Sequence, residues 1–255
     1  MNILDKIVAE KEREVASLPR RDVLMAAGRR DFHGALRKPR RGKVALIAEV
    51  KKASPSAGVI CADFDPVRIA REYEAAGADC LSVLTDVKFF QGSLKYLQQI
   101  REAVKLPLLR KDFIIDERQI PESIDNGADA ILLIVRILDD ARLKRFHALA
   151  TGAGLSVLVE AHDAREMDRA LAIGATLIGV NNRNLDNFTV DLSVTRRLAA
   201  RVSNEATLVA ESGIHSRADV EALAQSGAKA ILVGEALMRN PAGIAAKVSD
   251  LLGPR

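Results

Sequence analysis

Short apolar runs recur along the chain and are separated by longer amphipathic stretches. The dipeptide Gly-Ala precedes every second run, at positions 77–78, 127–128, 174–175 and 227–228, with spacings of 50, 47 and 53 residues. Such a period is about twice the length of one strand–helix unit. Each Gly-Ala follows a helical pattern, and glycine is the usual residue just past a helix C-terminus. The pattern therefore predicts strands that alternate with helices.

Eight strands follow from this pattern. They are predicted at Ala45–Val50, Cys80–Leu84, Leu106–Arg110, Ala130–Val135, Leu155–Val159, Leu177–Val180, Ala206–Ala210 and Ala230–Val233. Continuously apolar strands are typical of a parallel sheet covered on both faces, so we expect an α/β protein with a closed (β/α)8 TIM barrel. An open doubly wound sheet is the alternative, but no strand is followed by GxGxxG or by the GxxxxGK[ST] phosphate loop.

The segment before the first strand adds an element to the barrel. It carries apolar residues amid charges at Ile3, Ile7, Val15 and Leu18, which favours a helix that covers one end of the barrel. We therefore expect residues 1–255 to form a single domain, with residues 1–43 as an N-terminal helical extension and residues 44–255 as the barrel.

Composition and charge narrow the classes of partner. The chain is 48% hydrophobic and 28% charged, as in an ordinary globular protein with a sizeable core. The basic run at 37–43 has no interleaved aromatic residues, which argues against a nucleic-acid partner. We interpret it as a solvated linker. Two alternatives are that it steers a small anionic substrate or that it binds a polyanion. The apolar runs are too short to cross a membrane, and the first residues do not resemble a signal peptide, so we expect a cytoplasmic protein without a membrane partner.

Cysteine and histidine are too scattered to predict a metal site. Cys61 and Cys80 form no CxxC pair, and the four histidines form no HExxH motif. We expect no metal and no cofactor.

Polar residues gather where the predicted strands end. Glu49 and Lys51 share one face of the first strand, since side chains two apart in a strand point the same way. The other strand ends carry Lys111 and Asp112, Glu160 and His162, Asn181 with Asn182 and Arg183, Glu211 with Ser212, and Gly234 with Glu235. Catalytic groups of these barrels lie at the C-terminal strand ends. Three carboxylates and two lysines on one rim predict an ion-paired cluster suited to proton transfer, although any single member is also explained as a salt bridge that closes the barrel.

Two further sets of residues suggest binding roles. The loops with Ser212 and Gly213 after the seventh strand, and with Gly234 and Glu235 after the eighth, place glycines where backbone amides bind phosphate; tight turns are the alternative. Apolar residues beside the same rim predict a site for a flat apolar ligand, or else core packing under long loops: Leu84, Phe89, Phe90, Phe113, Ile115 and Leu185.

These residues closely resemble the indole-3-glycerol phosphate synthase family. The resemblance covers essentially the whole chain and is carried by IAEVKKASPS at 47–56, LRKDF at 109–113, LVE at 158–160, VNNRNL at 180–185, AESGI at 210–214 and VGEA at 233–236. It implies a lyase of tryptophan biosynthesis that closes the pyrrole ring of 1-(2-carboxyphenylamino)-1-deoxyribulose 5-phosphate with loss of carbon dioxide and water. The partner would be this small anionic substrate, and we expect a monomer.

The resemblance also implies roles for single residues. Lys111 matches the general acid, Glu49 and Glu160 match residues of proton transfer, and Lys51 matches a substrate contact that is a second candidate acid. The chemistry also calls for a carboxylate base, for which Glu49, Glu160 and Glu211 all qualify. Asn181 and Arg183 match residues that bind the hydroxyls and the anthranilate carboxylate. The phosphate would be bound by Ser54, Gly213, Gly234 and the backbone amide of Glu235. The ring would be held by Leu84, Phe90, Phe113 and Leu185.

Several details qualify this assignment. We expect neighbouring cations to lower the pKa of Lys111 so that it can act as an acid. Ala57 stands where the family commonly has lysine, which predicts altered loop dynamics or affinity, and Pro121 stands where tyrosine is common, which affects only local packing. Phosphoribosylanthranilate isomerase is the rival enzyme, but its cysteine base and aspartate acid are replaced here by Glu49 with Lys51 and by Asn181. An inactive barrel scaffold is the non-enzymatic alternative.

Overall fold

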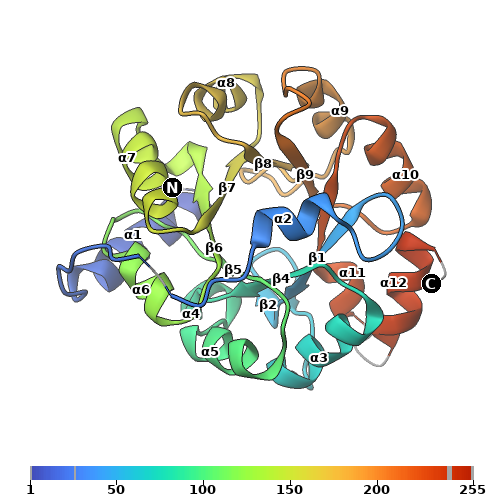
Figure 1. Cartoon of the computed structure of the whole chain (residues 1–255), viewed down its shortest axis with the longest axis horizontal. Helices are drawn as coiled ribbons and strands as arrows, with labels where there is room; N and C mark the ends of the chain where they lie inside the picture. Colours follow the sequence, from blue (N-terminus) through green and yellow to red (C-terminus); the bar gives the residue numbers. More distant parts are fainter. Residues whose placement is uncertain (1, 26, 240–242, 254–255) are drawn as a thin grey trace.

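The computed structural model describes residues 2–25, 27–239 and 243–253, and eight parallel strands close into one barrel within them (Figure 1). The barrel order is β1-β10-β9-β8-β7-β6-β5-β4, so neighbours in sequence are neighbours in space. The strands are β1 (Ala45–Val50), β4 (Cys80–Leu84), β5 (Leu108–Lys111), β6 (Ala130–Ile134), β7 (Ser156–Ala161), β8 (Leu177–Asn181), β9 (Thr207–Glu211) and β10 (Ala230–Val233). The predicted (β/α)8 barrel is confirmed, and the open doubly wound sheet is wrong.

Helices surround the strands on the outside of the barrel. Aspartate or serine caps most of the longer ones; Asp65, for example, accepts hydrogen bonds from the first backbone amides of α3, and Gly77 ends this helix in the left-handed conformation at φ 97°. The outer helices are α3 (Pro66–Ala76), α4 (Val87–Phe90), α5 (Leu94–Ala103), α6 (Gln119–Asp125), α7 (Asp140–Gly152), α8 (Ala164–Ala172), α9 (Ser193–Ala199), α10 (Arg217–Gln225), α11 (Glu235–Met238) and α12 (Ile244–Leu252), with a 3-10 turn η1 (Val135–Ile137).

Four strands run further than the sequence pattern predicts: β7 by two residues, to Ala161, and β5, β8 and β9 by one residue each. The last residues of β5, β8 and β9 are polar, namely Lys111, Asn181 and Glu211. The predicted strands stop where the apolar residues stop. The hydrogen bonding between strands continues further, because these polar side chains point into the barrel and leave the backbone free to pair. Asn181, for example, is in register with Glu211. A second difference lies after β1, where β2 (Ala53–Ser54) and β3 (Gly58–Val59) form a small antiparallel hairpin.

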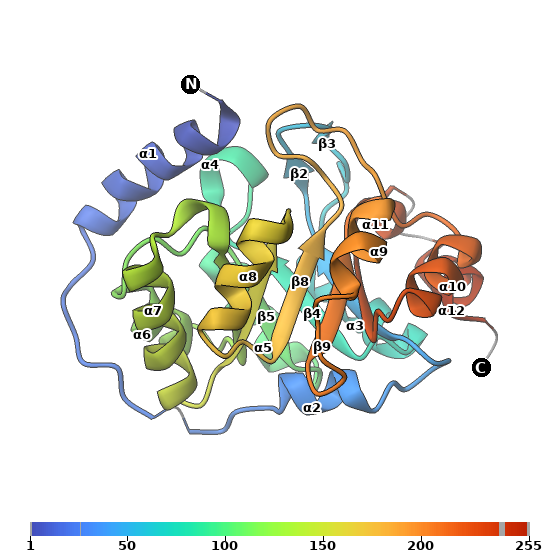
Figure 2. The ribbon, with the colours of Figure 1, turned by 90° about the horizontal axis from the view of Figure 1, so that it is seen from above.

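The N-terminal segment forms two helices at opposite ends of the barrel, not one element over a single end. In Figure 2, α1 (Ile3–Ala16) lies next to α4 at the end of the barrel that also carries the C-terminal strand ends and the β2–β3 hairpin, whereas α2 (Phe32–Arg37) crosses the opposite end, called the base here. Phe32 and Leu36 of α2 are buried against the inward-facing residues of the strands. The extension therefore closes the base and also reaches the mouth.

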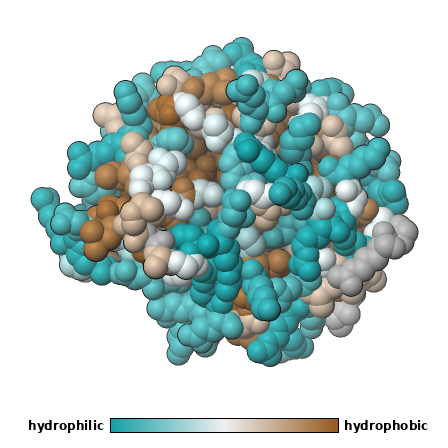
Figure 3. All heavy atoms as spheres, viewed as in Figure 1, coloured by the Kyte–Doolittle hydropathy of each residue, from teal (hydrophilic) through white to brown (hydrophobic). Residues whose placement is uncertain are grey.

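The basic run also lies at the base, away from the C-terminal strand ends. Its interpretation as a solvated linker is wrong for Arg41, which is buried and donates to the carbonyl oxygens of Ala76 and Gly253 at two helix ends. Arg40 likewise donates to the carbonyl oxygen of Ala78 at 3.0 Å. The face over α2 is covered mostly by hydrophilic side chains (Figure 3).

The barrel interior is apolar up to its last layer. The inward-facing residues of the lower layers include Ala45, Ile47, Leu109, Leu158, Leu177, Val209 and Leu232. Two residues further along the strands, at the same inward-facing parity, stand Glu49, Lys111, Glu160, Gly179 and Glu211. The strand alternation thus delivers the charged side chains to one plane at the mouth.

Candidate active site

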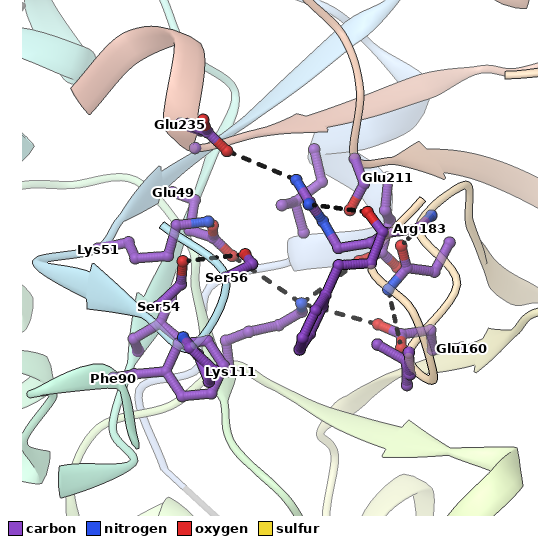
Figure 4. Close-up of a pocket in the computed structure, with 18 of the residues that line it drawn as sticks. Glu49, Lys51, Ser54, Ser56, Phe90, Lys111, Glu160, Arg183, Glu211 and Glu235 are labelled. Carbon is purple, nitrogen blue, oxygen red and sulfur yellow. Dashed lines mark hydrogen bonds and ion pairs between the residues drawn. The ribbon is translucent and has the colours of Figure 1, made fainter. Parts of the chain in front are cut away.

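A pocket opens at the C-terminal ends of the strands, and all but two of the catalytic and binding residues that the sequence predicts line it (Figure 4). These residues are Glu49, Lys51, Ser54, Leu84, Phe90, Lys111, Phe113, Glu160, Asn181, Arg183, Leu185, Glu211, Ser212, Gly213, Gly234 and Glu235. The two other apolar candidates do not line it: Phe89 lies beneath the ammonium of Lys88, and Ile115 is buried in the core.

Lys111 reaches from the end of β5 into the centre of this pocket, between three carboxylates (Figure 4). Its Nζ lies 3.4 Å from Glu211 Oε2, 3.7 Å from Glu160 Oε2 and 3.9 Å from Glu49 Oε1. Burial by itself would lower the pKa of Lys111, but the three carboxylates outweigh it and hold the pKa above its ordinary value. The expectation that neighbouring cations lower this pKa is therefore wrong, because anions from three other strands surround the ammonium.

The carboxylates themselves divide into two kinds. Burial and the charge of Glu160 raise the pKa of Glu211 to about 8, and neither carboxylate oxygen of Glu211 has a hydrogen-bond partner among the described residues. Burial also works against a charge on Glu49, but Lys51 and Lys111 outweigh it and lower the pKa of Glu49. The pKa values of the two groups thus shift in opposite directions, upward for Glu211 and downward for Glu49.

Lys51 belongs to the same cluster through Glu49. Its Nζ lies 2.6 Å from Glu49 Oε2, so the two charges that share one face of the β1 end form a direct ion pair. A Cβ atom on Gly234 would overlap Glu49 Oε2 and lie 3.1 Å from Lys51 Nζ. The glycine directly after β10 therefore leaves the space that this ion pair occupies.

Asn181 is the last residue of β8 and Arg183 follows it, on the opposite side of the pocket. Asn181 Nδ2 donates to Glu160 Oε1 at 3.3 Å, and Asn181 Oδ1 accepts from the backbone amide of Arg183 at 3.0 Å. The guanidinium of Arg183 lies 3.5 Å from Glu235 Oε2, and Glu235 is paired with Arg239 as well. Within the part of the chain that the structure describes, the guanidinium of Arg183 thus makes one long ion pair and a 3.4 Å hydrogen bond to the carbonyl oxygen of Phe188, and it retains donors for a planar anion.

An apolar wall faces these polar groups. The rings of Phe90 and Phe113 are 5.9 Å apart between centroids and tilted by 39°. Sequence reasoning missed part of this wall, because Ile3, Leu4 and Ile7 of α1 line it as well. Their spacing on one helix face was visible in the sequence, but not that this face covers the mouth.

Backbone geometry shapes the remaining wall, where the phosphate was predicted. Ser212 and Gly213 both adopt left-handed conformations, with φ 66° and 78°. A serine in this region is uncommon and marks a locally constrained backbone at the rim. A Cβ atom on Gly213 would overlap Val190 Cγ1, so the two loops meet closely here. Ser54 and Ser56 of the β2–β3 hairpin line the pocket too.

A buried ion-pair network anchors α1 beside Lys111. Lys11 Nζ lies 3.0 Å from both Asp86 Oδ2 and Asp112 Oδ1, and its side chain is 2% exposed. Asp112 also accepts from Thr85 at 2.5 Å and from Arg110 at 3.1 Å. Burial by itself would raise the pKa of Asp112, but Arg110 and Lys11 outweigh it and lower the pKa to about 2. The Asp112 carboxylate is therefore engaged in fixing the end of β5 and the helix that covers the mouth.

Gly179 is the clearest positioning residue that sequence reasoning missed. A Cβ atom on this inward-facing residue of β8 would overlap Glu211 Oε1. The carboxylate of Glu211 occupies the space that a side chain would fill. The only sequence signal is a glycine at an inward-facing position between Leu177 and Asn181.

The structure was also compared with the requirements of a metal site and of a membrane span. Within residues 2–25, 27–239 and 243–253, no group of three or more His, Cys, Asp and Glu residues is placed to hold a metal ion. Among the same residues, no helix has the length and apolarity to span a bilayer.

Comparison with known proteins gives a family match over almost the whole chain. The family model described as indole-3-glycerol phosphate synthase matches residues 4–251. An indole-3-glycerol phosphate synthase from Desulfotalea psychrophila is 51% identical over 247 residues, covering 93% of this chain and 94% of its own. One from Geobacillus thermodenitrificans is 49% identical, covering 93% of this chain and 92% of its own.

Solved structures share the fold at low sequence identity. The N-acetylmannosamine-6-phosphate 2-epimerase from Clostridium perfringens matches with a TM-score of 0.62 at 16% identity, over 89% of this chain and all of its own. A tryptophan synthase complex from Pyrococcus furiosus matches with a TM-score of 0.61 at 14% identity, over 84% of this chain and 99% of its own. These likenesses support the barrel fold and carry no argument about activity.

Proposed function

The chain belongs to the indole-3-glycerol phosphate synthase family, and from that premise we propose how its residues divide the reaction. The enzyme is a carboxy-lyase of tryptophan biosynthesis that acts on a small phosphorylated substrate. The observation that carries our assignment is the position of Lys111, whose ammonium is the centre of a ring of three carboxylates at the mouth.

In the first step, Lys111 acts on the ribulose carbonyl oxygen. The ammonium donates a hydrogen bond and then its proton to this oxygen as negative charge develops during attack by the aromatic ring carbon. The electron pair of the breaking carbon–carboxylate bond returns to the ring, and carbon dioxide leaves. Because anions surround Lys111, it is charged when the substrate arrives and is recharged after the transfer.

In the second step, the new hydroxyl group leaves as water. We assign delivery of its proton to Glu160, and proton removal from the ring to Glu49 or to Glu211 once Glu211 has ionised; the division between these two stays open. Lys51 holds Glu49 in its ionised form through the 2.6 Å ion pair and is the second candidate acid.

The other lining residues bind the substrate in this proposal. Leu84, Phe90, Phe113 and Leu185 contact the anthranilate ring, and Arg183 with Asn181 binds its carboxylate and the sugar hydroxyls. The phosphate lies between the hairpin residue Ser54 and the rim residues Ser212, Gly213 and Gly234, with the backbone amide of Glu235. The side chain of Glu235 is held by Arg183 and Arg239, which is consistent with a contribution through its amide alone.

Turnover of the carboxyphenylamino-deoxyribulose phosphate tests this function. The chain contains no tryptophan, so an indole product adds fluorescence over a low protein background. We expect the indole product, measured by its fluorescence, and carbon dioxide to form together in equal molar amounts. Absence of both signals with a folded protein would contradict the proposal and favour an inactive scaffold, whereas isomerisation of phosphoribosylanthranilate would favour the rival enzyme.

Three expectations about the whole protein remain proposals. We propose a monomer, a cytoplasmic location and a single folding domain over residues 1–255. The buried contacts of Lys11 and Phe32 with the barrel support the last of these. Size-exclusion chromatography with light scattering tests the monomer, and one cooperative unfolding transition seen by both circular dichroism and fluorescence of Tyr73 and Tyr96 tests the single domain.

A further inference from the structure

His162 lies directly behind Glu160 and has no place in the proposed mechanism so far. It follows β7, two residues beyond Glu160, and its side chain is only 4% exposed although it does not line the pocket. A buried histidine next to a proton-transfer carboxylate needs an explanation, because an imidazole nitrogen can both accept and donate a proton.

The outer nitrogen of His162 is fixed by Glu166 in the first turn of α8. Glu166 Oε2 lies 2.9 Å from His162 Nδ1 and accepts from the backbone amide of His162 at 2.8 Å. Burial by itself would raise the pKa of Glu166, but the bonds from His162 and Arg136 outweigh it and lower the pKa to about 2. An ionised carboxylate only accepts hydrogen bonds, so Nδ1 carries a hydrogen atom.

The inner nitrogen of His162 then faces Glu160. His162 Nε2 lies 3.4 Å from Glu160 Oε1, is fully buried, and has no hydrogen-bond partner that meets normal geometry among the described residues. Because Nδ1 is already protonated, the pair holds one exchangeable proton in either of two forms. Glu160 is protonated beside a neutral imidazole, or Glu160 is ionised beside an imidazolium.

Charged and polar groups on neighbouring elements surround this pair. Arg136 Nε, after β6, donates to Glu166 Oε1 at 2.8 Å on the outer side. Across Glu160, Asn181 Nδ2 lies 3.3 Å from the same Oε1 atom that faces His162, and Lys111 Nζ lies 3.7 Å from Oε2. The ionised Glu166 stabilises the imidazolium, while Lys111 stabilises the Glu160 carboxylate, so the arrangement favours the separated pair in the resting enzyme.

We propose that His162 is a positioning residue that stores the proton used by Glu160. This inference rests on the proposed function, in which a substrate carboxylate leaves as neutral carbon dioxide, so that each turnover consumes a proton. The Nε2–H bond of the imidazolium breaks and an O–H bond forms on Glu160. The hydroxyl group then leaves with the electron pair of its carbon–oxygen bond and takes this proton as water. Solvent recharges the pair through the open pocket after product release.

The pH dependence of kcat tests the proposal in His162→Gln, with His147→Gln as the matched control. His147 is half-buried on α7 and is not among the pocket-lining residues. Removing His162 turns a two-site proton store into one carboxylate, which loses its proton at lower pH. We expect kcat at pH 8 to fall more than about tenfold with KM within about twofold, and the alkaline limb of kcat to move down by at least about one pH unit. The control should match the wild type.

Two other results sharpen this test. Glu166→Gln keeps the imidazole but removes its counter-charge, so its alkaline limb should move in the same direction by a smaller amount. A uniform loss of kcat with an unmoved pH profile in both variants would overturn the proposal and leave His162 a packing residue.

A measurement without substrate separates this inference from the proposed function. In nitrogen-15 NMR of the histidine-labelled full chain, the His162 signals are assigned by their loss in His162→Gln. We expect Nδ1 to stay protonated at high pH and the pKa of His162 to fall in Glu160→Gln, because the facing carboxylate is gone. A proton on Nε2 at high pH, or an unchanged pKa, would overturn the proposal even if the enzyme turns over normally. Conversely, the expected NMR result in an inactive wild-type protein would contradict only the function.

Discussion

At the base of the barrel, Asp79 and Asp129 accept hydrogen bonds from the backbone amides of Leu46 and Leu108 at 2.7 and 2.9 Å. At the mouth, the equally buried Glu211 has no hydrogen-bond partner among the described residues. Acceptors filled by fixed backbone donors stabilise the fold but have no capacity left for a ligand. A carboxyl group buried with only the 3.4 Å ion pair to Lys111 and no hydrogen-bond donor of normal geometry in the described part of the chain costs stability, and proteins retain such groups where chemistry needs them.

Glu160→Gln, at the mouth, should show the largest loss of activity relative to its effect on stability. The amide keeps the shape and the contact with Asn181 but can neither take up nor deliver a proton. We expect kcat to fall roughly 10²- to 10⁴-fold with a small change in the thermal midpoint. Steady-state kinetics by indole fluorescence, paired with a thermal scan, measure both. A variant within tenfold of the wild type would remove Glu160 from the proton-transfer set.

Gly179→Ala tests whether the mouth depends on the space left for Glu211. The new methyl group would overlap the carboxylate oxygen, so we expect kcat to fall by about 10- to 100-fold, since small displacements at a reacting centre are costly. Gly152→Ala is the control, because no atom lies within 4 Å of its added Cβ and its φ is not left-handed. Equal activity of the two variants would show that Glu211 has room to move.

Asp129→Ala, at the base, should lower the stability of the protein and leave its activity unchanged. It leaves the backbone amides of Leu108 and Arg30 and the guanidinium of Arg101 without their acceptor. We expect the free energy of unfolding to fall by about 1–3 kcal/mol per buried donor left unpaired, with kcat unchanged in the folded protein. Urea unfolding monitored by circular dichroism gives the value. A loss of kcat without loss of stability would contradict the division between the two ends.

The smallest effect is a pH dependence of stability that comes from Glu211. Its pKa is about 8 in the folded chain and near 4.5 in the unfolded chain, so the folded chain holds more protons between these values. Its contribution to stability is present in full below pH 4.5 and is lost as the pH rises towards 8. In Glu211→Gln this loss is absent. The free energy of unfolding of the variant, relative to wild type, should therefore increase from pH 5 to pH 9; parallel curves would contradict the raised pKa.

The sequence predicted the mouth better than the base, and strand geometry explains why. Alternation along a strand tells which side chain points inward, so Glu49 and Lys111 were placed correctly without knowledge of their neighbours. It does not tell what lies across the barrel, and the pKa of Lys111 was therefore predicted in the wrong direction. The anchoring role of Asp79 was invisible for the same reason, because its partners come from β1 and from Arg40 in the chain before it.

Residues that act through contacts between distant segments also escaped prediction. Lys11 resembles any lysine on an amphipathic helix, yet it is buried against Asp86 and Asp112. Gly179 resembles any glycine in an apolar run, and only the closed barrel shows that Glu211 occupies its side-chain space. Such roles depend on the tertiary arrangement, which local pattern does not encode.

Turnover of Lys111→Ala at saturating substrate tests the central claim most directly. In the proposed mechanism, the ammonium inside the carboxylate ring is the acid for ring closure. It predicts a loss of kcat of at least about 10³-fold, in a protein whose circular dichroism and cooperative unfolding match the wild type. The matched variant Lys88→Ala, whose ammonium lies on the exposed face of α4 beside Glu10, should retain full activity. Turnover of Lys111→Ala within tenfold of the wild type would contradict the account and make Lys51 the acid.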